Sequence, residues 1–487
     1  MVSRRSESQG LLFAASECAP FFKTGGLGDV MGSLPKELAA NGHDVRVVLP
    51  YYIQKLDKKT QEQLEDVTDF TVKVGWRQQY CGIKKLVKDS VTYYFIDNLF
   101  YFDRPNLYDY GDDGERFAFF QQAAIEMLEK IDFIPEVLHV NDWQTAMIPV
   151  LLKDKYAWIN TLKDIKTVIT IHNILFQGVY DQYILSDLFN IGYAAFHEEG
   201  LKYGDKVCWL KGALYYSDLV TTVSPTYAEE IQTPEFGYGL DNDLRKINYK
   251  LVGILNGINY DTYNPEKDKS IPYQFSAADL SGKLKDKKAL QARVGLPEDE
   301  DIALIGVVTR LDEQKGVQLI VDAMEELLNF RNVQFVLLGT GKSYFEDAFR
   351  HFTWKYPDKC QAIIDFDNEL AQWIYAGVDF FLMPSEFEPC GLSQLNSLRY
   401  GTVPIVHEVG GLRDTIEPYN EFAEEGTGFS FHDFNVRTML NTIDRALKVY
   451  YEKPDSFELL QIRGMTENNS WEKSAEEYIQ KYKHLVY

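Results

Sequence analysis

A segment near the start of the chain combines residue types suited to binding a phosphate group. KTGGLGDV (Lys23–Val30) places a cation beside glycines, which let a backbone approach a ligand closely. It precedes a predicted helix, and the N–H groups at a helix start point outward toward anions. A tight turn with an exposed lysine is the alternative interpretation, because the segment has neither the GxGxxG spacing nor the Walker pattern.

A second candidate for anion binding is the segment TRLDEQKG (Thr309–Gly316). Arg310 and Lys315 follow an apolar run and flank the start of the next predicted helix. Two cations beside a positive helix end would hold a diphosphate well. A solvated loop with two surface cations is the alternative, and the Lys23–Val30 segment in the other half of the chain weakens it.

A third segment, PSEFEPCGLSQLNSLRYG (Pro384–Gly401), combines carboxylates with a glycine at a predicted helix start. Glu388 precedes this helix, where a carboxylate can accept hydrogen bonds from sugar or ribose hydroxyls while free N–H groups meet phosphate. The alternative for Glu388 is a charge that complements the helix dipole. Cys390 is of a type more often packed as a small apolar side chain than used as a nucleophile.

Alternating strand-like and helical patterns surround these segments. Short apolar, β-branched runs predict parallel strands, and amphipathic runs between them predict helices. In the first half, strands are predicted at 11–16, 45–50, 137–140, 167–172 and 219–224, with a helix at 29–40. In the second half, strands are predicted at 302–311, 333–338, 378–384 and 403–407, with helices at 316–328, 368–376 and 391–400. The pattern predicts the α/β class with two doubly wound, Rossmann-like sheets.

The length of the chain also predicts two large domains, because 487 residues exceed what one hydrophobic core usually organises. Ligands of doubly wound sheets bind outside the carboxyl ends of the strands. We therefore expect the active site to lie between the two domains.

Charge and cysteine content exclude several classes of protein. The formal net charge of −23 disfavours nucleic acids and anionic membranes as partners and suits a neutral polymer. The five cysteines are odd in number and include no CxxC pair, so neither a disulfide framework nor a zinc site is expected. The start, MVSRRSESQG, precedes too short an apolar run for a secretory leader, and no run of about 18 apolar residues follows. We expect a soluble, cytoplasmic enzyme.

Eight motifs resemble those of bacterial glycogen synthases and plant starch synthases, in the same order and over essentially the whole chain. They are KTGGLGDV, NDWQTA, TIHNILFQG, TTVSPTYAEEIQTPEFGYGLD, ILNGI, TRLDEQKG, FEPCGL and VGGLRDT. The resemblance implies the GT-B fold, with an acceptor-side domain at 1–250, a nucleotide-sugar-binding domain at 251–467 and a terminal helix at 468–487 that packs on the first domain. It also implies a retaining glucosyltransferase that moves glucose from ADP-glucose to the non-reducing end of an α-1,4-glucan in glycogen biosynthesis.

The same resemblance assigns roles to individual residues. The residues expected to be catalytic are His172, Arg310, Lys315 and Glu388. The donor phosphates are expected to contact Lys23, Gly25, Gly26, Arg310, Lys315, Gly391 and Leu392. The transferred glucose is expected to contact Asp142, His172, Asn256, Glu388 and Cys390, and Phe366 is expected to stack on the base. The alternatives are a satisfied core histidine for His172 and core packing for Phe366.

The resemblance implies neither a metal nor a cofactor, since ADP-glucose is a substrate. Retention in the family is explained by attack on the same face of the sugar, with the leaving phosphate taking the acceptor proton. No carboxylate pair stands out as the acid and base of a glycoside hydrolase. The sequence Asp365-Phe366-Asp367 spells the DxD of metal-dependent transferases, but it occurs where the family recognises the base, so we interpret it as coincidence. The expected partners are the nucleotide sugar and a glucan such as glycogen or a maltooligosaccharide.

Several positions depart from the commonest pattern of the family and leave the donor base, ADP or UDP, and the acceptor open. They are Asn141, Gly204, Asp205, Asn259, Glu386, Ser393 and Asn396. One alternative is another retaining GT-B hexosyltransferase with a UDP-glucose donor or a small acceptor. Another is a catalytically silent glucan-binding homologue, which should have lost Lys23, Arg310, Lys315 or Glu388, all of which are present. A nucleotide-dependent dehydrogenase is disfavoured, because GxGxxG is absent.

Overall fold

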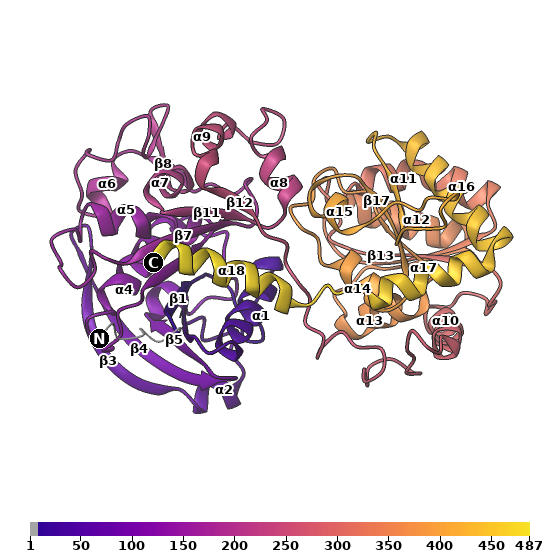
Figure 1. Ribbon diagram of the computed structural model, residues 1–487, viewed down its shortest axis with the longest axis horizontal. Helices are drawn as coiled ribbons and strands as arrows, with labels where there is room; N and C mark the ends of the chain where they lie inside the picture. The colour runs from indigo at the N-terminus through magenta and orange to yellow at the C-terminus, as the bar shows by residue number, and fades with distance from the viewer. Residues whose placement is uncertain (1–7) are drawn as a thin grey trace. The chain divides into compact units, whose positions relative to one another are not determined.

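The computed structural model describes residues 8–487, and the chain divides into two compact units (Figure 1). The first unit comprises Met1–Asn256 and Trp471–Tyr487, and the second comprises Gly257–Ser470. The expectation about a secretory leader concerns the first ten residues, of which 1–7 lie outside the described part. Over the described range, no helix is both long and apolar enough to span a membrane.

The first unit is built on a nine-stranded sheet with the order β12-β11-β7-β6-β1-β2-β5-β4-β3. Its strands are β1 (Gly10–Ala14), β2 (Asp44–Pro50), β3 (Glu65–Val74), β4 (Arg77–Lys88), β5 (Val91–Asp97), β6 (Val137–Asn141), β7 (Lys166–Ile171), β11 (Leu219–Thr222) and β12 (Leu251–Gly253). The strands from β12 to β5 are parallel, whereas β4 is antiparallel to both β5 and β3. The chain enters the sheet at β1 and later continues on its other side at β6, so the strand order reverses between β1 and β6.

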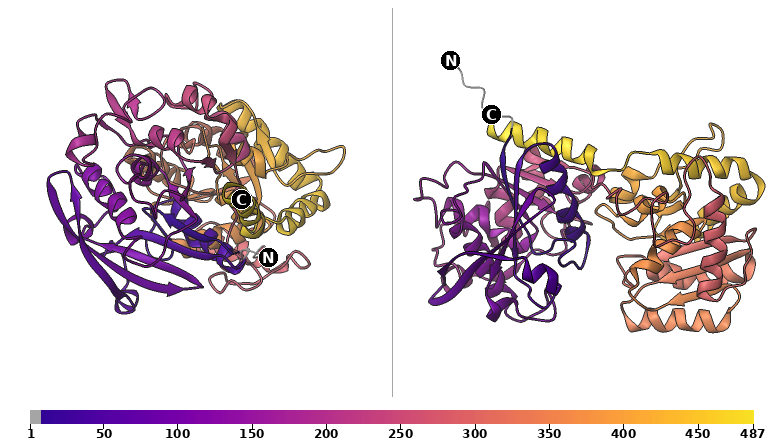
Figure 2. Two further views of the ribbon diagram at one scale, coloured as in Figure 1. Left: turned by 60° about the vertical axis from the view of Figure 1, so that its left-hand side comes forward. Right: turned by 90° about the horizontal axis from the view of Figure 1, so that it is seen from below.

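Helices and a small three-stranded sheet complete the first unit. The helices are α1 (Gly26–Ala40), α2 (Lys58–Glu62), α3 (Leu99–Phe102), α4 (Asp113–Glu126), η1 (Trp143–Thr145), α5 (Met147–Lys153), α6 (Ile184–Asp187), α7 (Trp209–Tyr216), α8 (Pro225–Glu230), α9 (Asp241–Lys246), η2 (Asn248–Lys250) and α18 (Trp471–Val486). The small sheet has the order β8-β10-β9, formed by β8 (Val179–Asp181), β9 (Lys202–Tyr203) and β10 (Lys206–Cys208). Helix α18, drawn in yellow, packs against α1 and so returns the end of the chain to the first unit (Figures 1 and 2).

The second unit is built on a six-stranded parallel sheet with the order β15-β14-β13-β16-β17-β18. Its strands are β13 (Ala303–Val308), β14 (Val333–Leu338), β15 (Cys360–Ile363), β16 (Phe380–Met383), β17 (Val403–His407) and β18 (Phe429–Phe431). Its helices are α10 (Ser281–Val294), α11 (Val317–Phe330), α12 (Ser343–Lys355), α13 (Asn368–Gly377), α14 (Ser393–Arg399), α15 (Gly410–Thr415), α16 (Val436–Glu452) and α17 (Pro454–Thr466). This is the strand order of a Rossmann fold, and it reverses between β13 and β16.

Burial and capping explain why these segments fold as they do. Strand β14 (VQFVLL) is buried at every position, as expected for a central strand covered by helices on both faces. Helix α11 buries an apolar stripe at helical spacing that includes Val317, Ile320 and Met324. Helix α13 begins where the Asp367 carboxylate accepts a hydrogen bond from the Leu370 N–H at 2.9 Å. Local sequence patterns thus agree with the packing of the core.

The predicted fold class, two doubly wound α/β domains with a terminal helix on the first, is confirmed. Two details differ from the expectation. The sequence places 251 onward in the second domain, but β12 pairs with β11, so Leu251–Gly253 extend the first sheet. The sequence places 468–470 with the terminal helix, but the Ile258 N–H donates to the Asn469 carbonyl, which ties this segment to the second unit.

Candidate active site

Two of the predicted segments in the second unit leave adjacent strands where the sheet order reverses. Thr309–Gly316 follows β13, Pro384–Leu392 follows β16, and these strands are parallel neighbours. Ligands of doubly wound sheets bind at this switch point, outside the carboxyl ends of the strands. The fold therefore places both segments where a ligand is expected.

Lys315 and Glu388 connect these two loops. The Lys315 Nζ lies 2.6 Å from the Glu388 Oε2, and the Ser385 Oγ donates to the same oxygen at 3.0 Å. The Glu388 side chain is only 7% exposed, so its oxygens depend on these donors for hydrogen bonds. Because an ammonium group has three N–H donors, Lys315 keeps capacity for a second anionic acceptor.

Gly316 allows the two loops to approach. Its φ is +66°, and a Cβ at this position would lie 1.8 Å from the Pro384 carbonyl oxygen. Two residues after Pro384, the Glu386 N–H donates to the Gln314 carbonyl at 2.9 Å. The position therefore requires a residue with no side chain.

The backbone around Glu388 is also held by the start of helix α15, which follows β17. A Cβ on Gly410 would lie 1.9 Å from the Glu388 carbonyl oxygen, and the Gly411 N–H donates to that oxygen at 3.1 Å. Cys390 is buried, and Gly391 and Leu392 immediately precede α14. The predicted contacts from Glu388 to Leu392 therefore lie on one constrained stretch of backbone.

Arg310 and Phe366 lie on the surface of the second unit. The Arg310 side chain is 63% exposed, with its guanidinium 3.7 Å from the Asp312 carboxylate. Phe366 is 76% exposed in the loop between β15 and α13, so core packing does not explain it. Asp367 caps α13, which gives one carboxylate of the DxD sequence a structural role. Among residues 8–487, no three potential metal ligands form a group that could hold an ion.

The switch point of the first unit lies between β1 and β6, and it also carries predicted residues. The Lys23 segment follows β1, and Asp142 directly follows β6. The Lys23 Nζ lies 2.6 Å from the Asp29 Oδ1 in the first turn of α1, and the lysine side chain is 40% exposed. A Cβ on Gly25 or Gly26 would meet no atom within 4 Å, so this face of the loop is open to a ligand.

Glu17 organises the loop, although the sequence analysis did not select it. Its Oε2 accepts hydrogen bonds from the N–H groups of Thr24 at 2.6 Å and Gly25 at 3.2 Å. Its Oε1 accepts from the Thr24 hydroxyl at 2.7 Å and from the Tyr108 hydroxyl at 2.6 Å. The Gly25 N–H is therefore already bonded to Glu17. A single glutamate between a strand and a glycine-rich turn is the only sequence signal for this role.

Asp142 has a strained backbone and an unusual acidity. Its φ is +55°, which is uncommon for a residue with a side chain, and its Oδ1 accepts from the His172 N–H at 2.7 Å. Loss of hydration raises the pKa of Asp142 to about 7, the charge of Glu17 acts in the same direction, and the N–H groups of His172 and Asn173 oppose it. Such perturbation is typical of functional sites.

His172 is held in one tautomer by Asn141. The Asn141 Nδ2 donates to the Ala14 carbonyl at 3.1 Å, so its Oδ1 accepts from the His172 Nε2 at 2.9 Å. Loss of hydration lowers the pKa of His172 to about 3, so the ring is neutral and its Nδ1 is an acceptor. Asn141, one of the departures noted in the sequence, thus has a defined structural role.

Asn256, the last residue of the first unit before the chain enters the second, carries a buried acceptor. Its side chain is 8% exposed, and its Oδ1 has no hydrogen-bond partner within the described residues. Buried polar atoms are normally bonded, so an unpaired one at a predicted sugar contact fits a ligand hydroxyl.

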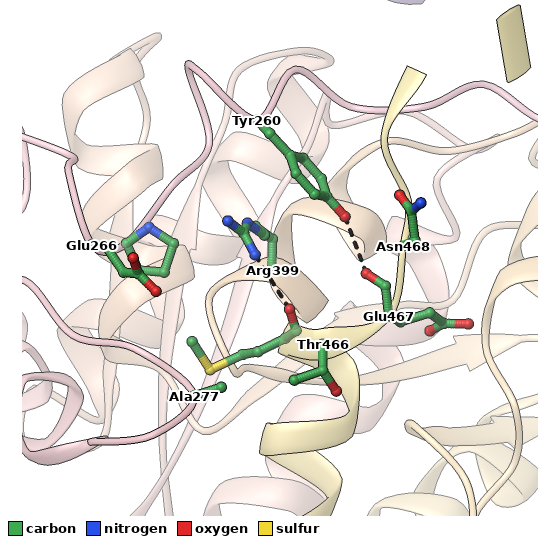
Figure 3. A pocket seen from close by; sticks show the side chains of 9 residues that line it. Tyr260, Glu266, Ala277, Arg399, Thr466, Glu467 and Asn468 are labelled. Atoms are coloured by element: carbon green, nitrogen blue, oxygen red, sulfur yellow. Dashed lines mark hydrogen bonds between the residues drawn. The ribbon is translucent and has the colours of Figure 1, made fainter. Parts of the chain in front are cut away.

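A cavity in the second unit is lined by residues other than these (Figure 3). It measures about 300 Å³ and is lined by Tyr260, Arg399 and Glu467 among others. The Arg399 guanidinium stacks on the Tyr260 ring at 4.3 Å, and the Tyr260 hydroxyl donates to the Glu467 carbonyl at 3.1 Å. None of the predicted site residues lines this cavity.

Comparison with protein families and solved structures identifies the relatives of the chain. Residues 10–246 match the family model described as starch synthase catalytic domain, and residues 286–458 match glycosyl transferases group 1. Glycogen synthase of Ligilactobacillus salivarius (strain UCC118) is 56% identical over 98% of this chain and 100% of its own length. Glycogen synthase of Lactococcus lactis subsp. lactis (strain IL1403) is 54% identical over 98% and 100%.

A solved structure agrees with these relatives. The catalytic domain of starch synthase IV from Arabidopsis thaliana, bound to ADP and acarbose, is 32% identical with a TM-score of 0.91, over 98% of this chain and 99% of that chain. The suspected resemblance is confirmed, and the chain belongs to the glycogen synthase family of glycosyltransferases.

Proposed function

We propose that this enzyme transfers glucose from ADP-glucose to the non-reducing end of an α-1,4-glucan, with retention of configuration at the anomeric carbon. The observation that carries the proposal is the match of 56% identity to a protein named glycogen synthase, over 98% of this chain and 100% of that protein. The positions of the predicted residues at both switch points support it.

The predicted ligands of the donor diphosphate are cations and backbone groups, and each unit carries its own set. Lys23 and the open face at Gly25 and Gly26 belong to the first unit, and Arg310 and Lys315 belong to the second. The backbone at Gly391 and Leu392, at the start of α14, adds N–H donors. Negative charge develops on the diphosphate as the glucosyl group leaves, so cations fixed beforehand stabilise the transition state.

The transferred glucose binds to hydrogen-bonding groups with defined orientation. The His172 Nδ1 accepts a sugar hydroxyl, because Nε2 is already bonded to Asn141. The Asn256 Oδ1 accepts a second hydroxyl, which satisfies a buried atom that has no other partner among residues 8–487. Asp142, Glu388 and the Cys390 backbone complete the contacts.

Phe366 stacks on the base of the nucleotide, since its ring is exposed beside the start of α13. The Arabidopsis starch synthase IV structure contains ADP, which favours adenine in this chain too. Neither a metal ion nor a cofactor takes part, since Arg310, Lys315 and Lys23 supply the positive charge.

The reaction balances without an enzyme nucleophile. The bond between the anomeric carbon and the diphosphate oxygen breaks, and the electron pair leaves with ADP. The 4-hydroxyl oxygen of the acceptor bonds to the anomeric carbon on the same face, and its proton passes to the departing phosphate. Glu388 has a binding role, consistent with its hydrogen bonds to Lys315 and Ser385. The enzyme acts in the cytoplasm on glycogen or a maltooligosaccharide.

A donor comparison tests the proposal. The protein is incubated with glycogen and either ADP-[¹⁴C]glucose or UDP-[¹⁴C]glucose, and label is measured in precipitated polymer and in small products. We expect label in the polymer from ADP-glucose, in bonds that an α-1,4-specific amylase cleaves. Polymer labelled mainly from UDP-glucose would show that the donor is UDP-glucose. Label only in a small product would show that the acceptor is not a glucan. No transfer from either donor would show that the protein is a catalytically silent homologue.

A further inference from the structure

A chain of buried hydrogen bonds links the C-terminal helix to the strands that carry Asp142 and His172. The Tyr482 hydroxyl of α18 lies 2.7 Å from the His139 Nδ1 in β6. The His139 Nε2 lies 2.6 Å from the Thr170 Oγ1 in β7, and the Thr170 Oγ1 lies 2.6 Å from the Thr221 Oγ1 in β11. All four side chains are buried, so each polar atom depends on its partner.

These hydrogen bonds lie close to the predicted sugar contact His172. His139 and Thr170 each precede a member of the bonded pair Asn141–His172 by two residues. Residues two apart in a strand share a face of the sheet, so His139 and Asn141 face the same side of β6. Thr170 lies on β7, and His172 directly follows the end of this strand. In the register of β6 and β7, His139 stands opposite Val168 and Asn141 opposite Thr170, so the bonded pairs His139–Thr170 and Asn141–His172 are successive diagonal contacts on one face. Thr170 and Thr221 stand opposite each other in the pairing of β7 with β11.

Only one assignment of donors and acceptors along these hydrogen bonds gives every proton an acceptor. If Tyr482 donates to the His139 Nδ1, then the His139 Nε2–H donates to Thr170 and Thr170 donates to Thr221. Thr221 can then donate to the Ile169 carbonyl at 3.4 Å. In the opposite direction the Tyr482 proton has no acceptor within the described residues, a costly state for a buried phenol. Burial lowers the pKa of His139 to about 3, so its ring is neutral and has one donor and one acceptor nitrogen.

We propose that Tyr482 is a positioning residue for glucosyl transfer: it fixes the tautomer and orientation of His139, which through Thr170 sets the strand ends that hold Asp142 and His172. The His139 ring also packs against two aromatic rings, with its centroid 4.8 Å from that of Phe13 and 5.7 Å from that of Tyr478. These contacts fix the plane of the imidazole as well. Helix α18 thereby forms part of the sugar site although none of its residues is predicted to contact the donor. The kinetic part of this inference rests on the proposed function, and the tautomer part does not.

The first test is spectroscopic. Ring-¹⁵N histidine is incorporated into the full chain, which has eight histidines, and His139 is assigned by comparison with His139→Gln. We expect His139 to be the Nε2–H tautomer in the wild type and a mixture of tautomers in Tyr482→Phe, which keeps the ring and loses the hydroxyl. An Nδ1–H tautomer in the wild type, or an unchanged spectrum in the variant, would overturn the inference whatever the activity of the protein.

The second test separates positioning from general stability. Thr170→Val removes the hydroxyl from the chain, Thr170→Ser keeps it, and Thr167→Val makes the same change at an equally buried site on β7 whose hydroxyl bonds to Asp218. We expect Tyr482→Phe and Thr170→Val to lower kcat about tenfold, equivalent to ~1.4 kcal/mol, with the KM for glycogen within twofold. We expect the kcat of Thr170→Ser to stay within about threefold of the wild-type value, and the kcat of Thr167→Val to equal the wild-type value.

Equal losses in Thr167→Val and Thr170→Val, or wild-type kcat in Tyr482→Phe, would contradict the positioning role. A wild-type protein that fails to transfer glucose from ADP-glucose would instead contradict the proposed function, and the tautomer measurement would still decide the inference.

Discussion

The Lys315 Nζ and the Glu388 Oε2 lie 2.6 Å apart, and this ion pair joins loops that are 73 residues apart in the sequence. The contact arises because β13 and β16 are neighbours at the switch point of a Rossmann-type sheet. Lys315, which is predicted to bind phosphate, and Glu388, which is predicted to bind the sugar, therefore restrain each other's positions. A change in either side chain removes a hydrogen-bond partner from the other.

Lys315→Ala should lower kcat/KM for the donor about 10²- to 10³-fold, by analogy with the loss of a fixed donor from an oxyanion site. The variant removes a cation from the diphosphate site and leaves Glu388 with the Ser385 hydroxyl as its remaining side-chain donor. Initial rates with labelled ADP-glucose and glycogen measure the effect. Lys342→Ala is the matched control, because Lys342 pairs with Glu313 on the surface of the same unit. Near-normal turnover in Lys315→Ala would remove this lysine from the mechanism.

Glu17→Gln should raise the KM for the donor about tenfold and change kcat less. The amide keeps one acceptor oxygen but turns the other into a donor, which cannot accept from Thr24 or Gly25. The loop that presents Lys23 then loses a defined shape. Donor titrations at saturating glycogen measure the change. Tyr108→Phe removes one of the four hydrogen bonds to Glu17 and should have a smaller effect on the same constant.

Asp142 should make the stability of the folded protein fall as the pH rises from about 4 to about 7. Its pKa is raised from 3.8 to about 7 in the folded chain, so in this interval the folded state binds a proton that the unfolded state has released. The stabilising contribution is complete below pH 4 and lost above pH 7. It amounts to about 4 kcal/mol, because the rise spans roughly three pKa units and each unit corresponds to about 1.4 kcal/mol.

Urea unfolding at several pH values checks this prediction. The difference in unfolding free energy between the wild type and Asp142→Asn should depend on pH across this interval, since Asn does not titrate. A difference that stays constant from pH 4 to 7 would mean that Asp142 is already ionised at the acid end.

The parallel strands could be predicted because their signals are local. The runs 333–338 and 403–407 coincide with β14 and β17, since buried parallel strands are apolar along their whole length. The β3–β4 hairpin could not be predicted in this way. Its residues EDVTDFTVKV mix charged and apolar side chains in an exposed edge strand, and the pairing depends on partners elsewhere in the chain.

The candidate site could be predicted only where residue types are distinctive. Lys315 and Glu388 stand out beside glycines, and their roles stay predictions, but their mutual contact depends on which strands become neighbours. Glu17 and His139 belong to no motif with a mechanism of its own. Their importance follows from hydrogen bonds to Thr24, Thr170 and other residues that only the folded chain brings within reach.

Gly316→Ala should destabilise the second unit by roughly 2–5 kcal/mol and nearly abolish transfer. A methyl group there adds the strain of a positive φ, about 1–2 kcal/mol, to a clash at 1.8 Å with the Pro384 carbonyl. Relief of the clash separates the β13 and β16 loops and pulls Lys315 away from Glu388. Gly295→Ala is the matched control: its φ is +85° at the end of α10, and a Cβ there meets no atom within 4 Å. Urea unfolding should therefore show a loss of only about 1 kcal/mol for Gly295→Ala, with normal activity. Equal losses of stability and activity in both variants would show that φ strain alone governs the two glycines, and that the close approach of the loops at Gly316 has no part in the reaction.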